Sequence, residues 1–352
     1  GVSTPHVDRL ATQGIRYERA FTTSPVCSTS RSAMMTGFHQ NYIGANQHRE
    51  HHKKPLPNGI KPIPHLFAEA GYFTALMSRK TDCNFTPNTK TELFMGEDWS
   101  EREPGQPFFA RITFGGTHRA FKRDPQRPID PADVELPPYY PDTTFCRRDW
   151  ANGLEQMQLV DREVGAIIQR LEDEGLADDT LVFFIGDHGR CHVRGKQFLY
   201  DGGIRIPMIM RWPGRVAPGQ VSEDLVMSID ICATILEAAG IEPPVALHGQ
   251  SLLGDEVSKR KYVFAARDKM DETHDAMRAI RSKDYKLILN LMPERPWCQY
   301  NRYKEGGYPM LAELNVLNLK GKLTPAQAAF MAPSKPEVEL YDLHSDPHEL
   351  NN

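Results

Sequence analysis

One cysteine stands in a short, mostly polar segment near the start of the chain, SPVCSTSRSAMMTG at residues 24–37. If a helix begins near Cys27, its free N–H groups and positive dipole end favour an anion there. Arg31, four positions further on, adds a fixed positive charge one turn away. These residues predict an anion-binding site beside a sulfur atom. The alternative interpretation is a helix N-terminus that carries a buried structural cysteine.

A second candidate follows an apolar run at residues 180–185, which leads directly into Gly186-Asp187-His188-Gly189. Open α/β sheets place their ligand sites at the carboxyl ends of such strands. A carboxylate oxygen suits a hard divalent ion, and a neutral imidazole is acceptable as a further ligand. Asp187 and His188 are therefore candidate metal ligands. The alternative is that the pair caps the next turn.

His118 and Lys196 are two further candidate catalytic residues. His118 follows the apolar run 107–114 across a Gly-Gly turn, and Lys196 lies in GKQFLYDGGIRIP at residues 195–207. A histidine protonates a leaving group near neutral pH, and a lysine stabilises a developing anionic oxygen. Cleavage of an ester of a strong dianion requires both functions. The alternative for each residue is a solvated position on the surface.

The elements that must position these residues alternate between helix and strand. Helices are predicted where apolar residues recur at helical spacing, and strands where short apolar runs occur. The predicted helices cover 4–14, 63–70, 154–174 and 230–239, and the predicted strands cover 72–77, 107–114, 180–185 and 206–211. The proline-rich, charged segment 120–142 is predicted to be a long surface excursion that lines a substrate cleft.

A change of composition near residues 254–259 indicates a domain boundary. Beyond it, short strands are predicted at 262–266, 277–281 and 285–290, the last two joined as a hairpin, which indicates a small antiparallel sheet. The predicted architecture is an α/β domain over residues 1–255 followed by a C-terminal α+β subdomain over residues 256–352.

Composition excludes several classes of protein. The chain has 42 Lys and Arg against 46 Asp and Glu, so it lacks the basic footprint of a nucleic-acid-binding protein. We expect no nucleic-acid partner. No uninterrupted apolar run approaches the length of a membrane span. The six cysteines are far apart and form no CxxC pair, so neither a zinc site nor a disulfide scaffold is expected.

Five segments occur in this chain in a characteristic order: TPHVDRLATQG, the C-x-x-x-R segment ending in MMTG, the strand before DHG, GKQFLYDGGIRIP followed by WPG, and ELYDLHSDPHE near the end. In this order they resemble the formylglycine-dependent sulfatases. The C-terminal region, from RDKMDETHDAMRAIRSKDYKLILNL to KLTPAQ, is most similar to the heparan N-sulfatase (N-sulfoglucosamine sulfohydrolase)-like branch.

The resemblance implies an alkaline-phosphatase-like, three-layer fold with a central mixed sheet between helices. It also implies a bound calcium or magnesium ion and a formylglycine made from Cys27 by a separate installing enzyme. The formylglycine hydrate would attack sulfur, and Arg31 would steady that nucleophile. Asp187, His188 and the modified Cys27 would hold the metal. His118 would act as general acid, with the family's sulfate-binding lysines at Lys80 and Lys196.

Four positions depart from the family pattern. His188 stands where an asparagine or glutamine is more common. Thr29 stands where the modification signature usually has proline or alanine, and Arg79 replaces a glycine. Asp82 replaces the histidine that helps to eliminate sulfate, so it is either the base, a ligand for a substrate cation, or a surface residue without a catalytic role. Family members also carry an N-terminal strand that ends in two metal-binding aspartates. The chain starts after that place, and we expect it to be a fragment of a longer protein.

The resemblance implies a sulfate ester or sulfamate on a sulfated glycan as substrate, and therefore an extracytoplasmic location, which is periplasmic, secreted or lysosomal. Candidate contacts for the sugar, with solvated loop residues as the alternative, are His39, His48, Arg49, His51, His52, Arg119, Lys122 and Arg278. Two other functions remain open. One is a phosphodiesterase or phosphonate monoesterase of the same superfamily, and the other is an inactive glycan-binding pseudoenzyme.

Overall fold

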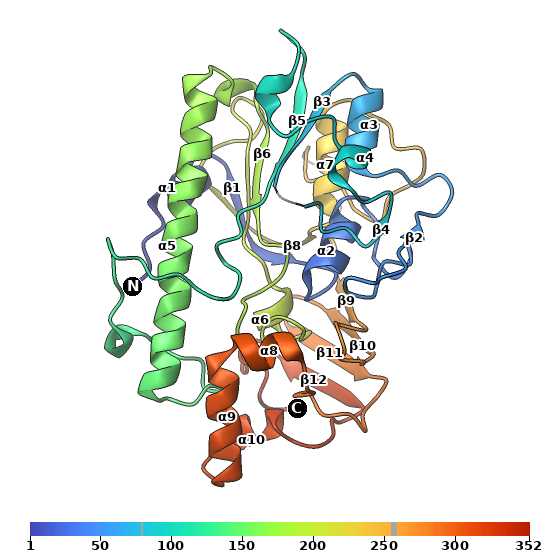
Figure 1. Ribbon diagram of the computed structural model, residues 1–352. Coiled ribbons are helices and arrows are strands. Elements are labelled where there is room, and N and C mark those ends of the chain that lie inside the picture. The colour runs from blue at the N-terminus through green and yellow to red at the C-terminus, as the bar shows by residue number, and fades with distance from the viewer. Residues whose placement is uncertain (79, 255–258) are drawn as a thin grey trace.

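The computed structural model describes residues 1–78, 80–254 and 259–352. Arg79 and the predicted domain boundary between residues 255 and 256 lie outside the described residues. The larger, N-terminal part of the chain has helices on both sides of a group of strands, which gives three layers (Figure 1). A smaller part, built from the C-terminal segment, lies below it in the same view.

A four-stranded sheet forms the centre of the larger part, in the order β6-β7-β1-β8. Its members are β6 (Val182–Ile185), β7 (Met208–Arg211), β1 (Ile15–Phe21) and β8 (Gln220–Met227). Strand β1 runs parallel to β8 but antiparallel to β7, and β6 is also antiparallel to β7. The central sheet is therefore mixed, as predicted.

A second, parallel pair of strands consists of β3 (Phe73–Met77) and β5 (Phe108–Ile112). All the described residues of β5 and β6 are only half-buried, although both strands are rich in apolar residues. Both strands line one large cavity of about 2780 Å³. The site residues discussed below lie along this same cavity.

Helix α5 (Thr144–Asp173) runs along one face of the strands beside α1 (Pro5–Thr12), and α2 (Cys27–Met34), α3 (Ile63–Glu69) and α7 (Asp230–Ala238) cover the other face (Figure 1). Apolar residues spaced along α5, including Val160, Val164 and Ile168, are buried in one cluster with Leu10 of α1. The helix predicted at 154–174 begins earlier, at residue 144. The sequence signal was weak there because the first turns bury few apolar residues.

Shorter elements connect these layers. They are β2 (Lys54–Pro55), β4 (Phe85–Thr86), α4 (Lys90–Leu93), α6 (Asp201–Ile204) and the 3₁₀ turns Trp99–Glu101, Pro131–Asp133 and Ala177–Asp179. The turn Pro131–Asp133 is the one regular element within the excursion 120–142, and residues at both ends of this excursion line the cavity. Within the described part of the chain, no helix combines the length and apolarity that a bilayer crossing requires.

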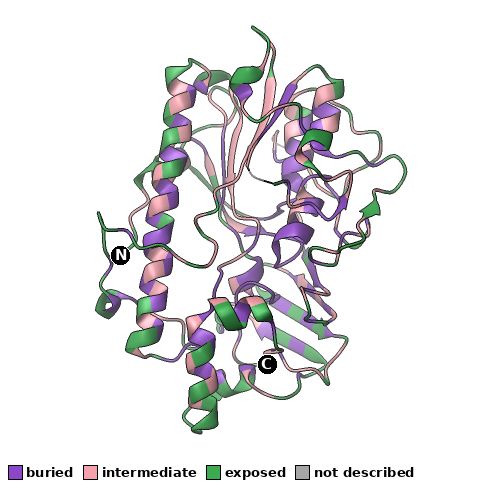
Figure 2. Cartoon of the chain, viewed as in Figure 1, coloured by how far each residue is buried: buried purple, intermediate pink, exposed green. Residues whose placement is uncertain are grey.

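The C-terminal part contains a four-stranded sheet, β12-β11-β10-β9, in which all neighbours are antiparallel. Its strands are β9 (Val263–Arg267), β10 (Met277–Arg281), β11 (Tyr285–Asn290) and β12 (Val338–Asp342), and its helices are α8 (Arg302–Gly307), α9 (Pro309–Leu319) and α10 (Pro325–Phe330). Exposed and buried residues alternate along β11, so one face of the sheet is covered and the other is open (Figure 2). The predicted antiparallel sheet is confirmed.

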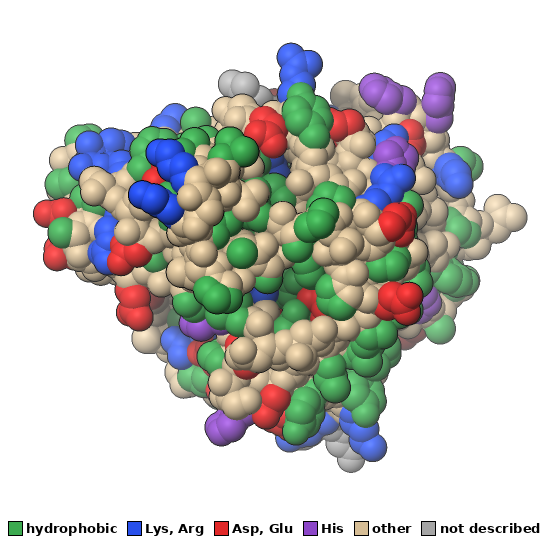
Figure 3. All heavy atoms as spheres, turned by 90° about the horizontal axis from the view of Figure 1, so that it is seen from below, with side chains coloured by type: hydrophobic (Ala, Val, Ile, Leu, Met, Phe, Trp, Pro, Cys, Tyr) green, Lys and Arg blue, Asp and Glu red, His purple; other side chains and the backbone are tan. Residues whose placement is uncertain are grey.

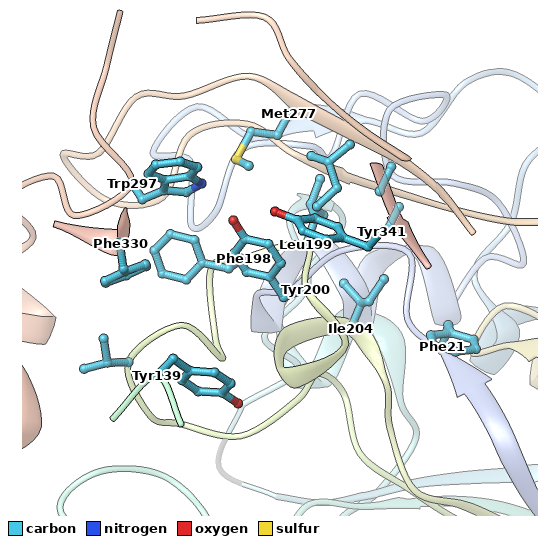
Figure 4. Packing of buried hydrophobic residues seen from close by; sticks show 14 of the residues in the cluster. Phe21, Tyr139, Phe198, Leu199, Tyr200, Ile204, Met277, Trp297, Phe330 and Tyr341 are labelled. Atoms are coloured by element: carbon cyan, nitrogen blue, oxygen red, sulfur yellow. The ribbon is translucent and has the colours of Figure 1, made fainter. Parts of the chain in front are cut away.

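The two parts share a core around the segment that follows Lys196. Phe198, Leu199 and Tyr200 are buried in one cluster with residues of the C-terminal part, namely Met277, Trp297, Phe330 and Tyr341 (Figure 4). Each fully buried aromatic side chain contributes roughly 1.5–3 kcal/mol. The C-terminal part therefore holds the loop that carries Lys196 in place.

Candidate active site

Cys27 is the first residue of α2 and is 5% exposed. Buried hydroxyl groups fix the turn that presents it. Thr29 Oγ1 donates to the carbonyl of Val26 at 3.1 Å, and Ser30 Oγ donates to the carbonyl of Asp187 at 2.5 Å. The second of these bonds joins the start of α2 to the segment that follows β6. The two motifs that the sequence analysis singled out, 160 positions apart along the chain, are therefore neighbours in space.

Two nitrogen atoms lie against the sulfur of Cys27. His188 Nε2 and Lys196 Nζ are each 3.2 Å from Cys27 Sγ. Burial by itself raises the pKa of the Cys27 thiol, but His188 and Lys196 outweigh this effect and bring that pKa down to about 7. Lys196 is 1% exposed, so it lies beneath the sulfur rather than on the cavity wall.

The tautomer of His188 follows from the contact of its Nδ1, which lies 2.7 Å from the carbonyl oxygen of Gly189. A carbonyl oxygen only accepts, so Nδ1 carries the hydrogen and the neutral imidazole leaves a lone pair on Nε2. One ligand atom each from Cys27, Asp187 and His188 lie within 4.8 Å of one another. The side chain of Asp187 is turned toward this cluster and accepts a hydrogen bond from Arg31 Nε at 2.8 Å.

Asp82 lies among three cations. Its carboxylate accepts from Arg49 Nε and Nη2 at 3.2 and 3.3 Å, and it lies 3.5 Å from Lys80 Nζ and 3.9 Å from Arg31 Nε. Burial raises the pKa of the Asp82 carboxyl group, but Arg49 leads the opposing effects and the net pKa is lowered. The carboxylate is therefore ionised at neutral pH, and cations already occupy its surroundings.

His118 lies after β5, where its Nδ1 is 2.9 Å from the carbonyl oxygen of Arg119 and its Nε2 is 3.3 Å from the hydroxyl group of Tyr303. Burial is the largest influence on the pKa of His118, and together with Lys196 and Arg49 it lowers that pKa. Tyr303 belongs to α8 and was not among the predicted site residues. A tyrosine 185 positions away carries no local signal of this contact.

The cavity brings most of the predicted site residues together. Its lining includes Cys27, Arg31, Lys80, Asp82, His118, Asp187 and His188, and also Arg49. Arg278 lies elsewhere, on β10, where it forms an ion pair with Asp268 at 2.9 Å. His48 is buried and lies 2.9 Å from Ser28 Oγ, so it supports the first turn of α2. On the face seen in Figure 3, acidic and basic side chains are interspersed.

Family models match most of the chain. The model described as Sulfatase matches residues 2–101 and 85–241, and a model described as N-sulphoglucosamine sulphohydrolase, C-terminal, matches residues 186–310. The chain belongs to the sulfatase family. The protein is a sulfuric ester hydrolase, and the predicted family resemblance is confirmed.

Named relatives match the whole chain. An ulvan-active sulfatase of Formosa agariphila is 32% identical over 402 residues, a match that covers 100% of this chain and 67% of the relative. The human N-sulphoglucosamine sulphohydrolase is 26% identical over 413 residues, which covers 100% of this chain and 81% of that protein.

Solved structures share the fold at low sequence identity. One, from work on the metabolism of multiple glycosaminoglycans by Bacteroides thetaiotaomicron, has a TM-score of 0.74 at 17% identity and covers 100% of this chain and 85% of that one. The phosphonate monoester hydrolase of Agrobacterium radiobacter has a TM-score of 0.73 at 17% identity, and the match covers 100% of this chain and 86% of that one. These likenesses confirm the predicted alkaline-phosphatase-like fold.

Proposed function

We propose that this sulfatase cleaves a sulfate ester or sulfamate on a sulfated glycan, with the modified side chain of Cys27 as nucleophile. The observation that carries the proposal is the convergence of Lys196 and His188, each 3.2 Å from Cys27 Sγ, at the start of a helix. A fixed cation, here Lys196, and a helix N-terminus stabilise the charge that develops on a sulfate group during cleavage. The names of the two relatives above support a glycan substrate.

The chemistry of the donor set supports a divalent metal. Asp187 supplies a hard carboxylate oxygen, and His188 presents the lone pair of Nε2. With an oxygen in place of the Cys27 sulfur, the set suits Ca²⁺ or Mg²⁺, which prefer oxygen ligands. When bound, the ion supplies charge neutralisation and lowers the pKa of an oxygen nucleophile.

Conversion of Cys27 to formylglycine requires an installing enzyme, which we propose as a partner. The hydrated aldehyde supplies an oxygen nucleophile that does not depend on thiolate formation. Thr29, which departs from the usual signature, has 0% exposure and hydrogen-bonds within the same turn. The modification therefore takes place before this segment folds.

We assign the remaining roles to side chains that line the cavity and to Lys196, which lies beneath the Cys27 sulfur. Lys196 and Lys80 bind sulfate oxygens, and Arg31 orients Asp187 through the bond at 2.8 Å. His118 donates a proton to the leaving group from Nε2. The ionised state of Asp82 and the three cations around it argue against a role as base. We propose a role outside the three predicted ones, in which Asp82 holds Arg49 and Lys80 in place.

We propose a role for Arg278 away from the scissile group. Its side chain lies beside Asp268 and is 40% exposed, and it contacts a more distant part of an extended glycan. Residues 1–255 form the catalytic domain, and residues 256–352 form a subdomain that packs on the Lys196 loop. Because sulfated glycans are found outside the cytoplasm, we place the protein in the periplasm, the lysosome or the extracellular space.

The test begins with the mass of the peptide that contains Cys27, from protein made in its source organism. Conversion to the aldehyde lowers the mass by about 18 Da, and we expect this loss together with release of sulfate from sulfated sugars. A Cys27→Ala variant is the control and should release none. An unmodified thiol in active protein would contradict the proposed nucleophile. Faster cleavage of phosphonate monoesters than of any sulfate would favour the phosphonate monoesterase alternative, and binding without turnover would favour the pseudoenzyme.

A further inference from the structure

Tyr303 is a side chain of the C-terminal part that contacts a proposed catalytic residue, His118. It lies on α8, whose first turn is fixed from outside the helix. The side chain of Asn301 accepts from Lys304 N at 3.1 Å, and Glu272 accepts from Arg302 N at 2.5 Å. The ring of Tyr303 also packs edge-on against Tyr308, with the ring centroids 5.5 Å apart. The position of the Tyr303 hydroxyl group is therefore set by a supported short helix.

Two groups with proposed catalytic roles touch Tyr303. Its hydroxyl oxygen is 3.3 Å from His118 Nε2, with the ring centroids 5.3 Å apart. Lys196 Nζ lies 4.9 Å from the centroid of the tyrosine ring, within the range of a cation–π contact. Since the same Nζ is 3.2 Å from Cys27 Sγ, Tyr303 borders both the proposed acid and the surroundings of the nucleophile.

The hydrogen bonds of His118 decide which nitrogen can transfer a proton. Nδ1 faces the carbonyl oxygen of Arg119 at 2.9 Å, so it carries a hydrogen in both the neutral and the charged ring. Only Nε2 changes its protonation state. In the neutral ring Nε2 accepts from the tyrosine hydroxyl group, and in the imidazolium Nε2–H donates either to that hydroxyl oxygen or to a leaving group.

The loop that supplies this carbonyl oxygen is itself anchored. The guanidinium group of Arg119 is bound to both oxygens of Asp149 and donates from Nε to the carbonyl of Cys191 at 2.9 Å. It also lies over the ring of Tyr308, 4.8 Å from its centroid. The backbone acceptor on one side of His118 and the tyrosine on the other are thus parts of one packed unit.

We propose that Tyr303 is a positioning residue for His118: its hydroxyl oxygen accepts from Nε2–H before the leaving group takes the proton, and its hydroxyl hydrogen is donated to Nε2 afterwards. The inference rests on the proposed function, in which His118 is the general acid. As the nucleophilic oxygen of the modified residue 27 bonds to sulfur, the bond between sulfur and the leaving oxygen breaks, and that oxygen takes the proton from Nε2. The neutral Nε2 then accepts the hydroxyl hydrogen bond of Tyr303, and His118 regains its proton from water.

The environment of His118 makes such a partner necessary. Burial disfavours the imidazolium. The charges that face it from the 48–52 loop and the 186–200 segment include Arg49, Lys196 and His188, each of which lowers the pKa of His118 further. The hydroxyl oxygen of Tyr303 is a neutral acceptor that stabilises the charged ring without adding a competing base. A phenylalanine at this position would keep the ring contacts and remove the hydroxyl group that bonds His118.

The test compares Tyr303→Phe with the wild-type enzyme on two substrates whose leaving groups differ. One is 4-nitrophenyl sulfate, whose phenolate leaves without protonation, and the other is a sulfated monosaccharide, whose alkoxide needs a proton. We expect Tyr303→Phe to lower kcat on the sugar about 10–100-fold, a part of the usual contribution of general acid catalysis. On the aryl sulfate, kcat should change by less than about twofold, because no proton transfer is needed there. Tyr300→Phe, at a side chain that is 67% exposed, is the matched control.

Two further variants separate this inference from the proposed function. His118→Ala should show the same dependence on the leaving group, and Tyr303→Phe should cause no additional loss in the His118→Ala background. If His118→Ala lacks the dependence, the proposed role of His118 fails and the inference fails with it. If His118→Ala shows it but Tyr303→Phe reduces both substrates equally, or neither, then only the positioning role of Tyr303 is overturned.

Discussion

Lys196 is a buried cation whose Nζ lies 3.2 Å from Cys27 Sγ, and we expect its replacement by methionine to reduce turnover strongly. Methionine keeps a long, unbranched apolar side chain that fills the same space, so the packing beside the Tyr303 ring is largely retained. The substitution therefore removes the charge and the three N–H donors with little change in packing.

The magnitude follows from the distance. A unit charge about 4 Å from a developing negative charge contributes about 4 kcal/mol at an effective dielectric constant of about 20. Because 1.4 kcal/mol corresponds to a factor of about ten, this is about a 10³-fold effect on rate. Arg31 lies in the same cluster and supplies part of the field. We therefore expect kcat to fall by about 10²–10³-fold, the range found when one oxyanion-stabilising donor is lost.

The assay is sulfate release from a sulfated sugar, with conversion of Cys27 verified by peptide mass in each preparation. The control is Lys304→Met, which removes another buried lysine, one whose Nζ lies 4.3 Å from the centroid of the Phe198 ring. This variant should keep the wild-type kcat. A modified Lys196→Met enzyme whose kcat stays within about threefold of wild type would refute the electrostatic reasoning.

Two other predictions concern pH. The pKa of His118 is lowered from its ordinary value of 6.5 by burial, Lys196 and Arg49, so the protonated acid is lost as pH rises through that lower pKa. The kcat on a sugar sulfate should fall over this pH range. The pH–rate profile of His118→Ala should lack this fall. Burial lowers the pKa of Lys304 from 10.5 to about 7. The loss of folding free energy caused by its charge is therefore complete below pH 7, shrinks as pH rises and vanishes above pH 10.5. Lys304→Met should therefore raise the free energy of unfolding by at most about 5 kcal/mol at pH 7 and by progressively less toward pH 10, as measured by urea denaturation. A gain independent of pH would contradict this.

Local sequence patterns were sufficient to predict the helix that carries the nucleophile and the strand that precedes the metal ligands. The four-residue spacing of Cys27 and Arg31 suits one face of a helix, and the structure starts α2 at Cys27. The apolar run before Asp187 is β6, and the hairpin of β10 and β11 has the predicted bounds. The central strands β1 and β8 were not predicted. Charged residues interrupt the apolar pattern of both strands, so their register was set by pairing with each other rather than by local propensity.

The chemistry of single residues depended on neighbours that are distant along the chain. Three interpretations of Asp82 were open from the sequence because its cations, Arg31, Arg49 and Lys80, come from three separate segments. The role of Arg278 also depended on a neighbour. Arginine is a residue type that can contact a sulfated sugar, but Arg278 forms an ion pair with Asp268 and does not line the cavity.

The sequence by itself determined the family, the order of the motifs and the residues able to do the chemistry, because helical spacing and strand ends are local properties. Only the tertiary structure decided that Lys196 lies beneath Cys27, that cations surround Asp82 and that Tyr303 contacts His118. Each of these contacts joins segments that fold into separate elements, and its energy depends on distance and burial. Neither quantity can be derived from spacing along the chain.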